Sequence, residues 1–175
     1  MNPTQQNMQF DPTHNYGSEN LEIAENLIRW KFAELLKNLI TLSSKAQRQT
    51  EIIGIGVACD EMVEDFNTYF TLSYNSYVEN YLLTHAQHLK LLELEMFFIE
   101  RSAYKSLDFW DDFLLSTNPE WEIVRQKAKE ILNMLDFKDL TVDLFREEKY
   151  ENTGNGNQIS IQSTQLRLVR IVEQF

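Results

Sequence analysis

The sequence predicts an α+β fold in which an antiparallel sheet packs against helices. Three observations lead to this prediction: a long apolar stripe at helical spacing near the N-terminus, two strand-like runs between residues 51 and 74, and alternating apolar residues around a glycine-rich turn near the C-terminus. A helix followed by a hairpin favours α+β over a doubly wound fold. We expect a flexible polar tail over residues 1–17 and a single domain over residues 18–175.

The most regular pattern predicts a long helix over residues 19–42. Ser18 or Asn20 is suited to cap its start, and the polar segment 43–50 ends it. Its apolar residues recur at steps of three and four: Leu21, Ala24, Ile28, Phe32, Leu35, Leu39 and Leu42. This stripe is wide enough to pack against the rest of the domain.

A hairpin is predicted over residues 51–74. Residues 51–58 (EIIGIGVA) are apolar and β-branched, which is typical of a buried strand, and residues 66–74 (FNTYFTLSY) alternate between two faces. Between them, residues 59–65 (CDEMVED) carry four carboxylates and favour a loop. Gly54 and Gly56 lie within the first strand and lack the third glycine and the position of a dinucleotide-binding turn.

The middle of the chain favours helices. Residues 76–92 show helical spacing, and we expect residues 92–100 to continue that helix, although a strand is the alternative there. A short amphipathic segment follows at 106–116. Asn118 as a cap and Pro119 at the first helical position predict a further helix.

The C-terminal part favours strands over residues 140–172. Apolar residues alternate from Leu140 to Leu144, and the segment 152–157 (NTGNGN) is a turn. Residues 158–172 then form one strand or two. A final helix from Ser163 is the alternative, since Leu168, Val172 and Phe175 also fit helical spacing.

Composition points to a protein of the cytoplasm that needs no cofactor for its stability. The 175 residues are 43% hydrophobic and 12% aromatic, which suffices for a packed core. The one cysteine, Cys59, has no partner within the chain for a disulfide, and the polar first twenty residues do not resemble a signal peptide. No apolar stretch reaches the ~20 residues of a membrane span.

The net charge of −11 is concentrated in one part of the chain. Residues 51–150 hold twenty acidic and nine basic residues, whereas the segments on either side are each balanced. Nucleic-acid binding requires clustered lysine and arginine, so nucleic acid is not expected as a partner. A localised negative field accelerates encounter with a basic protein, although a solvated acidic surface without a partner has the same composition.

Two groups of residues are the candidates for binding a partner. The first is the carboxylate cluster Asp60, Glu61, Glu64 and Asp65, which lacks the alternating spacing and glycine of a calcium loop. The second interleaves aromatic and acidic residues at Trp110, Asp111 and Asp112. Tryptophan is enriched at binding hot spots when exposed, although burial is its more frequent fate.

Two other features have weaker chemical interpretations. His85 and His88 lie three apart on the predicted middle helix, a spacing that brings two imidazoles to one metal, but no third ligand is evident. Cys59 adjoins Asp60 and Glu61, and these carboxylates are expected to raise the pKa of the thiol and to make it unreactive.

The order of these features resembles the small acidic α+β immunity-type proteins of bacterial toxin systems and their uncharacterised relatives. The resemblance is carried by the N-terminal helix, residues 51–65 and 66–74, the pair Trp110 and Asp111, and the segment 119–121 (PEW). It implies stoichiometric binding that masks a toxin enzyme, commonly a basic nuclease, and it implies no catalytic residues.

The leading hypothesis is therefore a binding protein for a basic partner, without enzyme activity, that contacts the partner through residues 59–65 and 108–113. One alternative is a metal-dependent hydrolase that uses His85 and His88 with a distant carboxylate. The other is a structural subunit that forms a homodimer through the free edge of its C-terminal strands.

Overall fold

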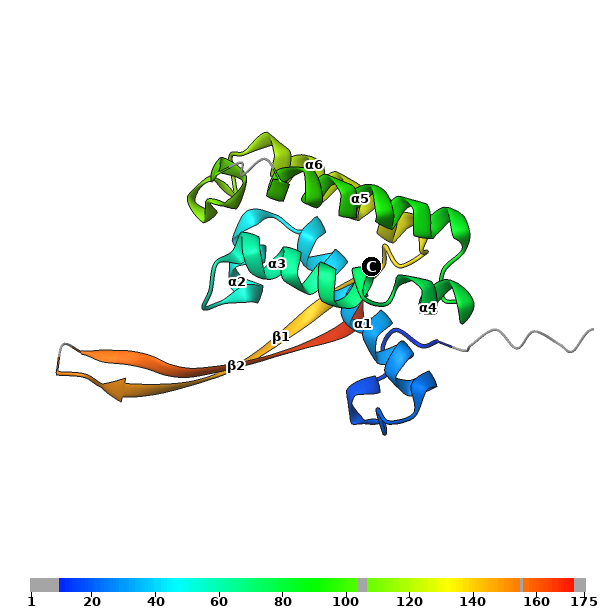
Figure 1. The fold of residues 1–175 in the computed structure, drawn as a ribbon. Coiled ribbons are helices and arrows are strands. Elements are labelled where there is room, and N and C mark those ends of the chain that lie inside the picture. The colour runs from blue at the N-terminus through cyan, green and yellow to red at the C-terminus, as the bar shows by residue number, and fades with distance from the viewer. Residues whose placement is uncertain (1–9, 104–106, 155, 172–175) are drawn as a thin grey trace, which may run out of the picture.

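The fold is α+β, as the sequence predicts. The computed structural model describes residues 10–103, 107–154 and 156–171. Within these ranges a body of six α-helices and several short helical turns carries a two-stranded antiparallel sheet, which extends away from the helices as a long arm (Figure 1). None of the helices in the described ranges combines the length and apolar character that a membrane span requires.

The long N-terminal helix is confirmed as α1, Ala24–Ser43, and it lies at the centre of the body. Leu35, Leu39 and Leu42 on its apolar stripe are fully buried. The helix begins five residues later than expected because Asn20 starts a turn: its side-chain oxygen accepts a hydrogen bond from the amide of Glu22 at 3.0 Å. The partner helix of α1 is α6, Pro119–Met134.

The predicted hairpin over residues 51–74 is wrong. Two helices, α2 (Ala46–Ile53) and α3 (Ala58–Phe66), and a π-helical turn over Asn67–Thr71 occupy this region. Gly54 has a φ of 77°, which a residue with a side chain rarely adopts, and it ends α2 instead of continuing a strand. The buried residues of α3 follow helical spacing, so the acidic segment 59–65 is part of a helix and not a loop: Ala58, Cys59, Met62, Val63 and Phe66.

The C-terminal strands are confirmed as a hairpin. Strand β1 (Leu140–Asn152) pairs antiparallel with β2 (Asn157–Arg170), and Leu144 lies opposite Leu166. Residues 163–170 are therefore strand, and the alternative of a final helix is wrong for them; residues 172–175 lie outside the described ranges. Only the base of the hairpin is buried in the body, so its distal half is exposed on both faces.

Contacts with α2 hold the base of the hairpin in place. The side chain of Arg48 donates to the carbonyl of Val142 at 2.9 Å, and that of Arg146 donates to the carbonyl of Ile52 at 2.8 Å. Beyond the end of α2, the amide of Ile55 donates to Gln162 Oε1 at 2.9 Å. These bonds fix both strands against the turn that connects α2 and α3.

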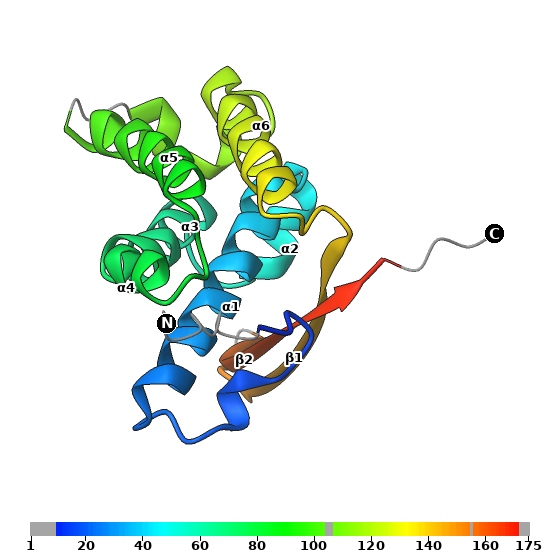
Figure 2. The same cartoon turned by 90° about the vertical axis from the view of Figure 1, so that its right-hand side faces the viewer.

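The remaining helices confirm most of the predictions for the middle of the chain. Residues 92–100 are helical, within α5 (His85–Ala103). The helical pattern at 76–92 is split between α5 and a short helix α4, Tyr74–Glu79. Helix α6 begins as expected, with Asn118 accepting a hydrogen bond from the amide of Glu120 at 2.9 Å. Helices α5 and α6 lie side by side (Figures 1 and 2).

Residues 10–17 differ from the expected tail. Tyr16 is buried, and Phe10 stacks on its ring at a centroid distance of 5.3 Å. Phe10 also packs edge-on against Phe32 of α1 and Phe137. The packing of these aromatic rings thus holds residues 10–17 against the helical body. The polar composition of the segment does not indicate this packing. Residues 1–9 of the predicted tail lie outside the described ranges.

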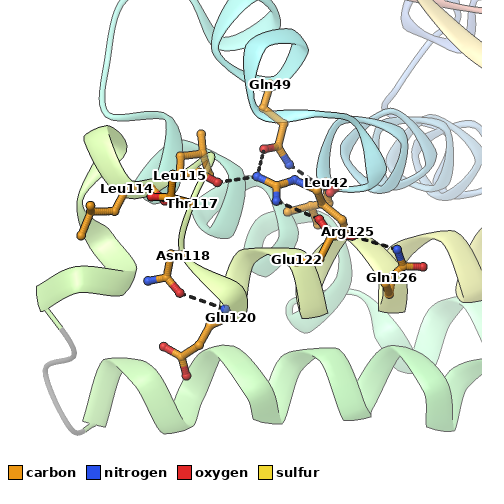
Figure 3. A network of polar contacts seen from close by, with 10 residues as sticks. All are labelled: Leu42, Gln49, Leu114, Leu115, Thr117, Asn118, Glu120, Glu122, Arg125 and Gln126. Carbon is orange, nitrogen blue, oxygen red and sulfur yellow. Dashed lines mark hydrogen bonds and ion pairs between the residues drawn. The ribbon is translucent and has the colours of Figure 1, made fainter.

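A buried arginine joins α6 to α2 (Figure 3). Arg125 donates to the carbonyl of Leu115 and to Gln49 Oε1, and it forms an ion pair with Glu122 at 3.2 Å. Gln49 in turn donates to the carbonyl of Leu42 at 3.0 Å. These bonds satisfy both terminal nitrogens of the guanidinium, while its buried Nε has no hydrogen-bond partner, and they fix α2 relative to α6 and the segment before it.

Candidate partner-binding site

The predicted carboxylate cluster forms the exposed face of α3, not a loop. Asp60, Glu61, Glu64 and Asp65 are all exposed, while the other side of the helix is buried. Asp60 and Glu61 lie in the first turn, where the helix dipole favours negative charge. The helix thus turns a run of acidic residues in the sequence into one continuous negative surface.

The second predicted group adjoins the start of this helix, but its members have different roles. Asp112 accepts hydrogen bonds from the amides of Ala58 at 2.7 Å and Cys59 at 2.9 Å, so it caps α3. Asp111 accepts from the amide of Phe113 at 2.9 Å and stays exposed. Both predicted segments therefore meet at the N-terminus of α3, where Asp112 has a structural role.

Trp110 and Trp121 separate into a surface and a core residue. Trp121 is fully buried and donates its indole N–H to the carbonyl of Phe109 at 2.7 Å. Trp110 is half-buried and packs edge-on against the Phe109 ring. Of the two tryptophans, Trp110 thus keeps surface that a partner can contact.

A cavity of about 280 Å³ opens beside the acidic face of α3. Glu61 and Asp65 of α3 line it together with Glu34 and Lys37 of α1, and Glu34 and Lys37 form an ion pair at 2.6 Å. Three carboxylates thus face one ammonium group. The remaining walls come from α1, the end of α2, the turn after it, the π-helical turn and β2: Asn38, Thr41, Ile52, Ile53, Ile55, Tyr69, Thr164 and Leu166. Glu34 has no distinguishing signal in the sequence, because only the fold brings it to this place.

Asn38 of α1 also lines the cavity, but its side-chain oxygen is enclosed. Its side chain is buried and donates to the carbonyl of Met62 at 2.9 Å, while its own oxygen, Oδ1, has no hydrogen-bond partner. A buried acceptor without a partner costs about 1–3 kcal/mol of stability. Because this oxygen is enclosed, the three carboxylates alone determine which ligand the cavity favours, namely a cationic group.

The crowding of negative charge changes the proton affinity of Asp65. Although Asp65 retains exposed surface, it also lines the cavity, and burial there raises the pKa of its carboxyl to about 6. The charges of Glu61, Glu34 and Glu64 add to this rise in the pKa. Burial and the same neighbours, Glu34 and Asp65, raise the pKa of the Tyr69 hydroxyl. A bound cation would relieve this repulsion.

The other candidate residues form no comparable grouping. The ring centroids of His85 and His88 lie 6.4 Å apart, and His88 packs on Phe70. Burial is the main cause that lowers the pKa of His88, and the charge of His85 lowers it further. Burial is the main cause that raises the pKa of the Cys59 thiol, and the neighbouring carboxylate of Asp112 raises it further. Within the described part of the chain, no three histidine, cysteine, aspartate or glutamate residues are placed to hold a metal ion.

Comparisons with protein families, with curated proteins and with solved structures found no match to this chain. The proposed function therefore rests on the geometry of the acidic face and its cavity.

Proposed function

We propose that this protein is a binding protein for a basic protein partner, which it contacts through the acidic face of α3 and the adjoining cavity. The observation that carries the proposal is the convergence of Glu34, Glu61 and Asp65 at one cavity. A lysine or arginine side chain of the partner supplies the positive charge that balances these carboxylates.

The resemblance to immunity-type proteins supports a more specific proposal, in which the partner is a toxin enzyme that this protein masks by binding. The excess of acidic residues within 51–150 fits this class of partner, because a basic enzyme is steered toward a negative surface and held there. In this proposal the protein itself performs no chemistry. Trp110, at the N-terminal end of the same surface, is an aromatic contact at the margin of the interface.

The test is binding to the product of the adjacent gene, co-expressed with this protein and purified as a complex. Affinity is then measured by calorimetry for a double variant with Glu61→Gln and Asp65→Asn. We expect binding at least tenfold weaker, since charged pairs at an interface typically contribute more than the 1.4 kcal/mol that corresponds to that factor.

The matched control neutralises two carboxylates on the hairpin, Glu147→Gln and Glu151→Gln, which are exposed and line neither this cavity nor the larger one beside β2. It changes the net charge by the same amount, and we expect its affinity to stay within about twofold of the original protein's. Equal losses in both variants, or no loss in the first, would contradict the proposed site.

A further inference from the structure

Helix α5 is apolar on two sides, although only one of them packs against the body. Leu91, Leu94 and Phe98 are buried and form its inner face. A second row of apolar residues runs along its outer face, and we call it the α5 stripe: Leu89, Leu92, Met96 and Ile99. Leu92 is half-buried, and the other three are exposed to 47%, 52% and 49% in chain order. A surface helix normally carries polar residues on that side, so the stripe is a candidate interface.

The spacing of the α5 stripe indicates the kind of surface that fits it. Its residues follow one another at steps of three, four and three, which is the spacing of the two apolar positions in a coiled-coil heptad. Side chains at this spacing pack as knobs into the holes between the side chains of a facing helix. From Leu89 to Ile99 the stripe is about 15 Å long, at 1.5 Å per residue. The surface that fits it is therefore another helix.

A second copy of α5 is a helix with the matching pattern. The α5 stripe is symmetric about residue 94, so an antiparallel pair related by a two-fold axis places Leu89 of one copy against Ile99 of the other. By the same symmetry Leu92 lies against Met96. Each layer of the pair then joins two apolar residues of similar size. A two-fold interface requires this self-complementarity.

The charges beside the α5 stripe agree with the antiparallel arrangement. At 3.6 residues per turn, Lys90, Glu93 and Glu100 fall on the same side of the stripe. The two-fold axis brings Lys90 of one copy within about 3 Å, measured along the helix, of Glu100 of the other. Glu93 lies close to the axis, and it already forms an ion pair with Lys90 of its own chain at 2.9 Å. Opposite charges thus face each other along this side of the pair.

The free edge of the C-terminal strands is the other surface on which two copies can meet, but it is less suited to the purpose. The pairing of β1 with β2 shifts in register between Lys149 and Tyr150. Such a bulge twists an edge strand and interrupts its row of backbone donors and acceptors. The α5 stripe, by contrast, is continuous and lies on a helix whose inner face is fixed by buried side chains.

We propose that two copies of this protein associate through their α5 stripes as an antiparallel helix pair. The interface uses none of the residues that line the acidic cavity, so the proposal is independent of the proposed function. A dimer of this kind carries two acidic cavities.

The first test is the solution mass, measured by light scattering across a dilution series. We expect the original protein to pass from dimer to monomer on dilution. Met96→Lys puts one ammonium group from each copy into the apolar interface and is expected to weaken association at least tenfold. The matched control, Ile161→Lys on β2, adds the same charge at a similarly exposed side chain and is expected to leave association unchanged. Circular dichroism checks that both variants keep the fold.

The second test is cross-linking, which determines the orientation of the two helices. Leu89→Cys and Ile99→Cys are prepared as separate variants, and a short bismaleimide is added to each alone and to their mixture. Cys59 is fully buried, so the introduced thiol is the reactive one. In the antiparallel pair, position 89 of one copy lies beside position 99 of the other, whereas the two positions 89 are about 15 Å apart along the axis. We expect cross-linked dimers in the mixture and not in either variant alone.

A monomer at every concentration up to about 0.1 mM would overturn the proposal. So would a dimer that Ile161→Lys dissociates and Met96→Lys leaves intact, because the interface would then lie on the hairpin. Cross-links within each single variant would overturn the antiparallel arrangement. The remaining case is a monomer in which the amides of α5 gain protection from hydrogen exchange only in a complex with the product of the adjacent gene; it would assign the stripe to that partner and overturn the proposal.

Discussion

Replacing Asp65 by asparagine tests the electrostatics of the acidic cavity without any knowledge of the partner. Burial and the charges of Glu61, Glu34 and Glu64 raise the pKa of Asp65 to about 6. The folded protein therefore holds the proton of this carboxyl more tightly than the unfolded chain does. Between about pH 4 and pH 6 the folded state carries more protons, so stability falls as the pH rises through this range.

The magnitude follows from the shift in pKa. A rise of about two units corresponds to about 3 kcal/mol for a fully shielded group. Asp65 retains exposed surface, and solvent screening reduces the effect to about 1 kcal/mol. Asp65→Asn removes the charge and keeps the shape of the side chain. We expect the variant to be about 1 kcal/mol more stable than the original protein at pH 7.5 and nearly unchanged at pH 4.

The assay is urea unfolding followed by circular dichroism at these two pH values, with Asp60→Asn as the control. Asp60 lies on the same exposed helix face, but in the first turn, where its charge is favourable to the helix. The control is expected to be neutral or slightly destabilising at pH 7.5. A gain for Asp65→Asn that is equal at both pH values, or a loss at pH 7.5, would refute the crowding of charge at the cavity.

Three further variants test how the site is held in place, all by urea unfolding and the third also by amide hydrogen exchange. Asp112→Ala removes the cap of α3 and is expected to cost about 1–2 kcal/mol, against about 0.5 kcal/mol for the exposed control Asp111→Ala. Arg125→Met leaves buried acceptors unpaired and is expected to cost about 2–3 kcal/mol, of which an added Gln49→Leu recovers part. Gly54→Ala places a methyl group 2.2 Å from Gln162 Oε1, at a φ of 77° that alanine rarely adopts, and is expected to cost about 1–2 kcal/mol of stability. Because Gln162 Oε1 accepts a hydrogen bond from the amide of Ile55, we also expect faster hydrogen exchange at that amide. An unchanged exchange rate at Ile55 would contradict this clash.

The sequence predicts those elements whose signals are local. The cap and proline at Asn118 and Pro119 mark the start of α6, and the alternation around residues 152–157 marks the C-terminal hairpin. The region 51–74 is misleading because EIIGIGVA has the composition of a strand. Its helical character appears only when Gly54 is taken as the end of a helix that begins in the polar segment before it.

The candidate site depends more on tertiary contacts than on local pattern. The carboxylates of α3 are evident in the sequence, although not as one helical face. Glu34 and Asn38 belong to α1, and no spacing within that helix indicates that they meet α3 and β2 at a cavity. Asp112 is acidic and lies close to an aromatic residue pair in the sequence, so it resembles an interface residue. Its role as a cap is evident only from its hydrogen bonds to the amides of Ala58 and Cys59, which are more than fifty residues away in the sequence.

The packing of α1 against α6 has a consequence for how the chain folds. Residues 44–118 lie between these two helices, so their contact closes a loop of about 75 residues, at an entropic cost of about 4 kcal/mol. The hairpin, by contrast, pairs neighbouring segments and can form within microseconds. We therefore expect the arm to assemble early and the helical body to limit the folding rate. Until α6 has been synthesised and docks, the leucine stripe of α1 lacks its main partner and is open to chaperones and to aggregation.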